Sequence, residues 1–325
     1  MTQKLNRRTL LTLGAATLLA LGGCSSSGED AKVEQKAGQT DAVYRGNGPI
    51  KITVTTGMIA DIVRNVGGER VQVTALMGPG VDPHLYKASQ SDIAKLSDAD
   101  IIFYNGLHLE GKMGEILERV GESKPVVPVS EKIDQKLLRT PPEFAGNPDP
   151  HVWFDVSLWM KATETVRESL VHFDAANKEL YAKNAGVYLP QLQKLHNYAK
   201  AQIATVPKAR RVLVTAHDAF GYFGRAYDIE VVGLQGISTA GEYGLNDVQR
   251  LVDSISKRRI KAVFVESSIP RRSIEAVVQG CKAKGHNVNI GGTLYSDAMG
   301  GAGTPEANYI GMVKHNVDTI VKALK

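Results

Sequence analysis

Short runs rich in β-branched residues alternate with longer amphipathic stretches along almost the whole chain after Pro49. The strand candidates in the first half are IKITVTT, VQVTALM, DIIFYNG and KPVVPVS, and those in the second half are RVLVTAHD, EVVGLQG, KAVFVESS and NVNIGGTLYSD. Strands separated by helices pair in parallel, because each helix carries the chain back to the start of the next strand. The alternation therefore predicts an α/β protein with two β/α lobes, each built on a parallel-rich sheet.

A long segment, residues 176–207, separates the two groups of strands. Its large side chains recur at roughly helical spacing, at Leu180, Tyr181, Tyr188, Leu192, Leu195 and Tyr198. A helix of about 25 to 30 residues would be about 40 Å long, enough to run along both lobes. We expect one rigid connecting helix, bent at Pro190, between lobes at 49–175 and 208–325. Lobes joined in this way cannot hinge freely.

Residues 1–23 predict a targeting signal rather than part of the fold. The cationic MTQKLNRRTL precedes the apolar LLTLGAATLLALGG, which is shorter than the ~20 residues of a membrane span. The LGGC sequence that ends at Cys24 resembles a bacterial lipobox, which implies cleavage before Cys24 and a diacylglycerol on its thiol. An uncleaved membrane helix is the alternative, and the paired arginines leave both Sec and twin-arginine export open.

The polar residues 24–48 predict a flexible tether between this lipid anchor and the folded body. The formal charge of +5 includes three cationic residues of the leader, so +5 − 3 = +2 remains, which gives no reason to expect a nucleic-acid partner. Cys24 and Cys281 are the only cysteines. If Cys24 is acylated, Cys281 has no partner, and we expect no disulfide within the chain.

Three histidines and one aspartate lie at or after the carboxyl ends of predicted strands: His84, His151, His217 and Asp297. In open parallel sheets the loops after the strands line one crevice, so these side chains can converge between the lobes. His84 and His151 both end an Asp-Pro-His sequence, in which the proline stiffens the loop. Their spacing matches no local zinc motif, and histidines that cap backbone groups are the alternative.

Four longer stretches carry a family resemblance: DPHLYKASQSDIAKLSDADIIFYNGLHLEGKM, DPHVWFDV, VTAHDAFGYFGRAYDIEVVG and SDAMGGAGTPEANYIGMVKHNVDTIVKAL. Together they are similar to the metal-binding receptor lipoproteins of bacterial ABC importers, the zinc and manganese receptors of the TroA-like group. The resemblance covers nearly the whole mature chain. It implies two β/α lobes joined by a rigid helix, with one metal ion in the cleft between them.

Carried over residue by residue, the resemblance places the metal ligands on His84, His151, His217 and Asp297. It also implies an extracytoplasmic, lipid-anchored protein that passes a divalent metal ion to an ABC permease and its ATPase. We expect the receptor to act as a monomer and not as an enzyme.

His217 favours zinc as the metal. The manganese-type members of the family have glutamate in the stretch similar to VTAHDAF, and three imidazoles with one carboxylate suit tetrahedral Zn²⁺ better than Mn²⁺. Manganese stays open, because no histidine-rich loop occurs between His108 and His151. Export of the folded protein, with its metal chosen in the cytoplasm, would also leave manganese possible.

Two other classes of function compete with a metal receptor. A zinc hydrolase needs an open coordination position and a general base, whereas the four candidate ligands fill a tetrahedron and no HExxH sequence accompanies them. A receptor for a metal chelate or another organic ligand needs an aromatic-lined cavity, and only 6% of the residues are aromatic.

Several further polar residues could support the site. Three aspartates adjoin candidate ligands in the sequence: Asp82, Asp149 and Asp218. They could orient the imidazoles, although backbone carbonyls often do so. Glu266 ends a predicted strand and could face the cleft or pair with Arg271 or Arg272. The remaining histidines are expected at the surface or capping backbone groups: His108, His172, His196, His286 and His315. A place near the cleft is the alternative for His108, because it follows a predicted strand.

The Cys24→Ala variant tests the predicted anchor. Two acyl chains hold a protein stably on a membrane, whereas a single chain binds only marginally. We expect the variant to be released from the membrane fraction or to remain unprocessed, as judged by fractionation and by mass. A variant that stays membrane-bound with normal cleavage and normal mass would contradict the lipoprotein assignment.

Overall fold

A computed structural model of the protein describes residues 42–325. The predicted signal at 1–23, Cys24 and most of the predicted tether at 24–48 lie outside the described residues. Within residues 42–325, no helix has both the length and the hydropathy needed to cross a membrane.

The first lobe is built on a four-stranded parallel sheet with the order β2-β1-β3-β4. Its strands are β1 (Ile50–Val54), β2 (Val71–Ala75), β3 (Ile101–Tyr104) and β4 (Val126–Pro128). Each of the four strands predicted in the first half is therefore confirmed. Between them lie the helices α1 (Gly57–Gly67), α2 (Gln90–Asp98) and α3 (Gly114–Gly121), followed by α4 (Val156–Phe173).

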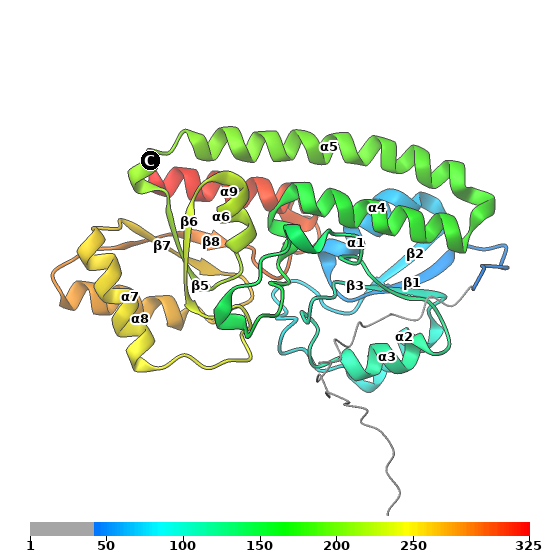
Figure 1. The fold of residues 1–325 in the computed structure, drawn as a ribbon, viewed down its shortest axis with the longest axis horizontal. Helices are drawn as coiled ribbons and strands as arrows, with labels where there is room; N and C mark the ends of the chain where they lie inside the picture. The colour runs from blue at the N-terminus through cyan, green and yellow to red at the C-terminus, as the bar shows by residue number, and fades with distance from the viewer. Residues whose placement is uncertain (1–41) are drawn as a thin grey trace, which may run out of the picture. The chain divides into compact units, whose positions relative to one another are not determined.

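Helices cover both faces of this sheet, as Figure 1 shows for α1 and α4 on one side and α2 and α3 on the other. Successive side chains of a strand point to opposite faces, and β3 displays this alternation. Ile101 and Phe103 pack into the core that includes α1 and α4. Ile102 instead packs with Leu96 of α2 and Leu117 of α3. Because both faces of the strand are covered, its residues are apolar without alternation, which explains the continuous apolar run in the sequence.

The second lobe contains two parallel pairs of strands, β5 with β6 and β7 with β8. The strands are β5 (Val212–His217), β6 (Glu230–Gln235), β7 (Ala262–Glu266) and β8 (Asn289–Leu294), which confirms the four predicted in this half. The helices are α6 (Gly221–Tyr227), α7 (Leu245–Arg258), α8 (Arg272–Ala283) and α9 (Tyr309–Leu324). The buried, unpaired Cys281 lies in α8, in the core that α7 and α8 form with the strands.

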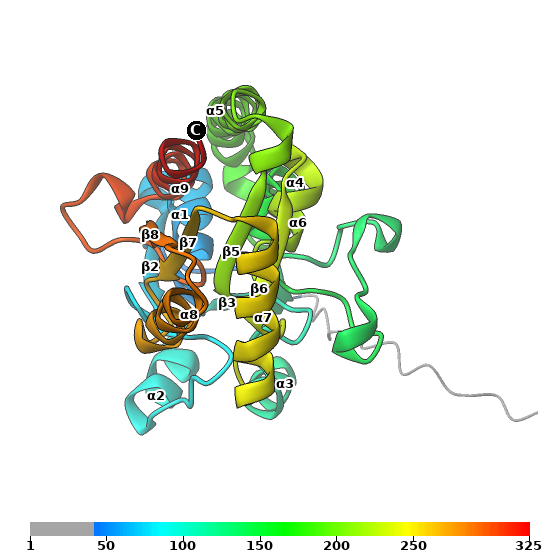
Figure 2. The same cartoon turned by 90° about the vertical axis from the view of Figure 1, so that its left-hand side faces the viewer.

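The helix α5 (Lys178–Ala204) joins the lobes and is 27 residues long. It packs against α4 of the first lobe and α9 of the second, and Figure 2 shows it end-on beside both. Tyr181, Tyr188, Leu192 and Leu195 are buried along it, whereas Leu180 is exposed. The predicted connecting helix is thus present. The bend at Pro190 and the lobe boundaries at 175 and 208 stay predictions.

A buried carboxyl group fastens α5 to α1. Asp61 of α1 is 9% exposed, and its Oδ2 accepts a hydrogen bond of 2.7 Å from the Tyr188 hydroxyl. Burial raises the pKa of Asp61, and the bond from Tyr188 partly offsets this rise. A buried polar group that loses its partner destabilises the folded state by the free energy of its desolvation.

We therefore expect Tyr188→Phe to lower the free energy of unfolding of the metal-free protein by about 1–3 kcal/mol. The matched control is Tyr198→Phe. Tyr198 lies on the same helix as Tyr188, but its hydroxyl bonds to Asp318 of α9 in an exposed contact. The control should change the free energy by no more than about 0.5 kcal/mol. Denaturant titrations measure both values, and equal losses in the two variants would contradict the proposed role of the buried bond.

Candidate metal centre

His84 lies in the loop between β2 and α2, directly after Pro83. Its backbone N–H donates a 2.9 Å hydrogen bond to Asp82 Oδ1, so the carboxylate fixes the backbone of this Asp-Pro-His sequence. The imidazole is buried. Asp82 therefore supports His84 through the backbone rather than through the ring, unlike the orienting role considered from the sequence.

His151 ends the second Asp-Pro-His sequence, in the long connection between β4 and α4. Asp149 Oδ1 accepts hydrogen bonds from His151 Nδ1 at 2.8 Å and from its backbone N–H at 3.0 Å. Arg139 donates a 2.5 Å bond to Asp149 Oδ2 and so holds the carboxylate. Because Nδ1 carries the donated proton, the lone pair of the neutral ring lies on Nε2. The predicted orienting contact between Asp149 and an imidazole is present.

The other two candidate residues come from the second lobe. His217 is the last residue of β5, and Asp297 follows the end of β8. Glu266 at the end of β7 accepts a 2.9 Å hydrogen bond from the His217 backbone N–H through Oε1, and its Oε2 lies 2.6 Å from His217 Nδ1. This second contact lacks hydrogen-bond angles, so the two groups interact there as charges. Of the two alternatives predicted for Glu266, the structure shows the one in which it faces the cleft. Arg271, a predicted partner in the other alternative, pairs with Glu275 instead.

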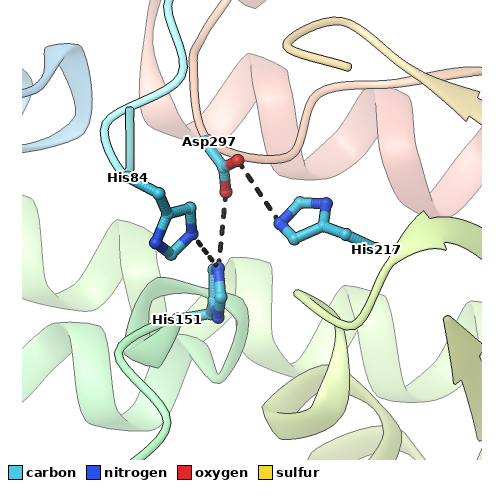
Figure 3. A group of neighbouring side chains, drawn as sticks. All are labelled: His84, His151, His217 and Asp297. Carbon is cyan, nitrogen blue, oxygen red and sulfur yellow. Dashed lines mark hydrogen bonds and ion pairs between the residues drawn. The ribbon is translucent and has the colours of Figure 1, made fainter. Parts of the chain in front are cut away.

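The four side chains converge between the lobes, as Figure 3 shows. One donor atom from each of them lies within 4.8 Å of all the others. His84 Nε2 is 3.2 Å from His151 Nε2, His151 Nε2 is 3.5 Å from Asp297 Oδ1, and His217 Nε2 is 3.3 Å from Asp297 Oδ2. None of the four residues is more than 3% exposed.

Burial and mutual charge set the protonation of this cluster. Burial lowers the pKa of His84 to about 3, so the ring is neutral at physiological pH. Burial acts in the same direction on His217, but the carboxylates of Glu266 and Asp297 raise its pKa well above the ordinary value. Burial opposes ionisation of Asp297, yet the imidazoles, His217 foremost, hold its pKa below the ordinary range. A carboxylate is thus ionised in the centre of the cluster.

Two metal-facing atoms of the cluster have no hydrogen-bond partner among residues 42–325. They are His217 Nε2 and Asp297 Oδ1, and both are fully buried. Such groups are rare in folded proteins, because each one loses its hydration without a replacement. Once His217 has lost its proton, the imidazole lone pairs and the one negative charge that face a common point are the donor set of a cation site.

The remaining candidates lie outside the cluster. The side chain of Asp218 contacts none of the three rings through a hydrogen bond within the described chain, and burial raises its pKa. His108 and His172 are exposed, in agreement with a surface role. His286 is buried against the carbonyl of Ile260, which is a capping contact. His196 lies 3.4 Å from the hydroxyl of Tyr227, and His315 lies 3.0 Å from the carbonyl of Thr293.

Trp153 supports the candidate metal centre, and the sequence did not predict this role. Its Nε1 donates a 3.0 Å hydrogen bond to the carbonyl of Ser296, the residue before Asp297, and its ring lies 5.2 Å from that of His151. One buried side chain therefore positions a candidate ligand from each lobe. The sequence shows only that Trp153 follows His151 by two residues, and its partner lies 143 residues away.

Comparison with known proteins decides the family. Residues 52–323 match the family model described as zinc-uptake complex component A, periplasmic. The chain belongs to this family. The resemblance found in the sequence is therefore confirmed, and the family is one of metal-binding substrate receptors of ABC transporters. Its members are solute-binding receptors rather than enzymes.

Three relatives show how far the similarity extends. The manganese-binding lipoprotein MntA of Bacillus subtilis (strain 168) is 47% identical over 319 residues, which cover 98% of this chain and 100% of MntA. The zinc-binding protein TroA of Treponema pallidum (strain Nichols) is 50% identical over 289 residues, 88% of this chain and 92% of TroA. The manganese ABC transporter substrate-binding lipoprotein PsaA of Streptococcus anginosus is 31% identical over 323 residues, 97% of this chain and 98% of PsaA.

The fold agrees with the sequence comparison. The solved structure of periplasmic zinc-binding TroA from Treponema pallidum superimposes with a TM-score of 0.83 and 49% identity. The match covers 85% of this chain and 99% of that one. The predicted fold class, two lobes with parallel sheets, is confirmed.

Proposed function

We propose that this protein is an extracytoplasmic receptor that binds one Zn²⁺ ion through His84, His151, His217 and Asp297 and delivers it to an ABC permease. The observation that carries the proposal is the convergence of four buried donor atoms from two lobes on one point. Family membership supports the transport role. The metal is the cargo, and the protein's work is to capture it, hold it and release it.

The spacing of the donor atoms supports a four-coordinate ion. Zinc bonds of about 2.0–2.1 Å to nitrogen and oxygen in a tetrahedron place neighbouring donors about 3.3 Å apart. The three measured separations are 3.2, 3.3 and 3.5 Å. These distances are close to such an edge, but the last two involve different oxygens of Asp297, and a complete set of four donor atoms is held within 4.8 Å. The donors are therefore near one another before the ion binds and must draw together around it.

The surrounding residues favour capture of a cation at neutral pH. His84 is neutral, and Asp149 sets the His151 ring so that Nε2 faces the cluster. Asp297 supplies one negative charge in a buried setting, where its attraction for a cation is stronger than in water. Imidazolium at His217 must lose its proton before the ring can bind metal, so capture releases a proton.

The same arrangement argues against the alternatives considered from the sequence. A hydrolytic zinc site keeps one position open for water, whereas here four protein donors lie within 4.8 Å of one another and would occupy all four positions of a tetrahedral ion. Donor atoms within 4.8 Å of one another also leave no room for an organic chelate between them. We therefore infer that the cargo is the bare ion and that the protein is not an enzyme.

We further propose that a lipid on Cys24 anchors the receptor at the outer face of a membrane. The sequence LGGC supports this anchor, and so do two similar proteins, MntA and PsaA, which are named lipoproteins. The tether at 24–48 would then give the receptor reach to its permease, and the receptor is proposed to act as a monomer.

Addition of Zn²⁺ to metal-stripped protein tests the function. One equivalent should bind, and a thousandfold excess of free metal over Kd adds ~4 kcal/mol of stability, because only the folded state has the site. The melting temperature should rise by several degrees. His84→Ala should abolish most of the rise, while the exposed His172→Ala should keep it. An unchanged melting temperature in the wild type, or an equal loss in both variants, would overturn the proposed site.

Manganese is the second candidate, because both oxygens of Asp297 face the cluster. Asp297 turns Oδ1 toward His151 and Oδ2 toward His217, so the site can offer two oxygens and three nitrogens. Mn²⁺ prefers more oxygen donors and a higher coordination number than zinc. MntA, a relative over 98% of the chain, is named for manganese.

His217 is expected to set the selectivity between the two metals. In His217→Glu a carboxylate replaces an imidazole, so the ratio of the zinc affinity to the manganese affinity should fall. In His217→Ala both affinities should fall, because a ligand is lost. Competition titrations at one pH measure the ratio, since proton release makes affinities at different pH values incomparable. An unchanged ratio in His217→Glu, or wild-type zinc binding in His217→Ala, would remove His217 as the selecting ligand.

A further inference from the structure

The His151 side of the cluster is fastened between the lobes by buried groups. All residues from 149 to 156 are buried. Trp153 Nε1 donates to the Ser296 carbonyl at 3.0 Å, and the Trp153 carbonyl accepts from the Tyr309 hydroxyl at 2.6 Å. The rings of Phe154 and Phe220 stack with centroids 4.1 Å apart. Separation of the lobes on this side would expose aromatic surface and break several buried hydrogen bonds together.

The His84 side is fastened much more weakly. The loop 78–87 lies at the surface, and Leu85, next to His84, is 49% exposed. In the described part of the chain, this loop makes one side-chain hydrogen bond to the second lobe outside the four-residue cluster. The Thr239 hydroxyl donates it to Asp82 Oδ2 over 2.6 Å. A hydrogen bond to a carboxylate is stronger than one between neutral groups.

This bond connects the two ends of the candidate site. Asp82 uses its other oxygen, Oδ1, to accept from the His84 backbone N–H. Thr239 is 8% exposed, and its carbonyl accepts a 2.8 Å bond from Gln235 Nε2. Gln235 pairs with His217 in the register of β5 and β6. A short chain of contacts therefore runs from His217 through Gln235, Thr239 and Asp82 to His84.

From this asymmetry we propose that Thr239 is a positioning residue of the metal site. Its hydroxyl holds the His84 loop against the second lobe, and rupture of the Thr239–Asp82 bond is the step that frees His84 and lets the ion leave on this side. The inference rests on the proposed function as a metal receptor. Beyond that function, it specifies the side from which the ion leaves. It also names a residue that does not contact the metal but sets how long the ion stays bound.

The isosteric Thr239→Val variant removes the hydroxyl and keeps the volume. We expect the dissociation rate of Zn²⁺, followed by stopped-flow mixing with an excess of chelator, to rise about tenfold, which corresponds to about 1.4 kcal/mol. The association rate should change far less, because weakened contacts act mainly on dissociation. Thr239→Ser keeps the hydroxyl and should restore slow dissociation. Thr163→Val is the matched control, since the buried Thr163 hydroxyl donates within α4 to the carbonyl of Trp159.

Each other outcome overturns the inference. Equal dissociation rates in the wild type and Thr239→Val would show that the bond does not retain the ion. Fast dissociation in Thr239→Ser or in Thr163→Val would assign the effect to packing rather than to the hydroxyl. Failure of the wild type to bind Zn²⁺ would refute the proposed function itself, so the two failures are distinguishable.

Discussion

The structure depends on one electrostatic arrangement, the burial of a carboxylate among three imidazoles between the two lobes. Asp297 and its three neighbours are almost completely excluded from solvent, and two of the inward-facing atoms have no hydrogen-bond partner in the part of the chain that the structure describes. Removing a charge from water costs several kcal/mol unless a partner compensates it. Protonated His217 provides part of that compensation in the metal-free protein. A divalent cation at the same point would complete it, because all four donors already face inward.

The two lobes can keep such a cluster assembled because their relative position is fixed elsewhere. The helix α5 packs on α4 and α9, and Tyr188 of this helix bonds to the buried Asp61 of α1. The rings of Phe154 and Phe220 stack across the lobe interface. Donors held in place in this way lose little freedom when the ion binds, which favours affinity. In the proposed receptor, they would also release the ion through a local movement of the His84 loop, without separation of the lobes.

The carboxylates behind the imidazoles complete the arrangement. Asp149 holds the His151 ring through Nδ1, and Glu266 lies against Nδ1 of His217. Each carboxylate turns its imidazole so that Nε2 faces the centre, and it makes the ring more basic, as outer carboxylates do around metal-binding histidines. The same negative charges make protonation of His217 more favourable, so proton and metal compete for this ring. In the proposed receptor, residues that do not contact the ion would therefore set the balance between retention and release.

The sequence by itself determined the strands, the connecting helix and, through its family resemblance, the four residues of the cluster. Apolar periodicity located the eight strands that the structure shows in residues 42–325 and the long α5 helix, because the buried face of a strand or helix repeats apolar residues at a regular spacing. The position of each candidate ligand after a strand indicated that they could meet. Only the tertiary structure decided which neighbours support them. Asp149 and Asp82 occupy the same place in two identical tripeptides, and each accepts a bond from the backbone N–H of the following histidine. Asp149 also bonds to the imidazole ring of that histidine, whereas Asp82 bonds to Thr239. Thr239, like the Ser296 partner of Trp153, comes from a distant segment, and local sequence carries no record of contacts formed only when the lobes pack together.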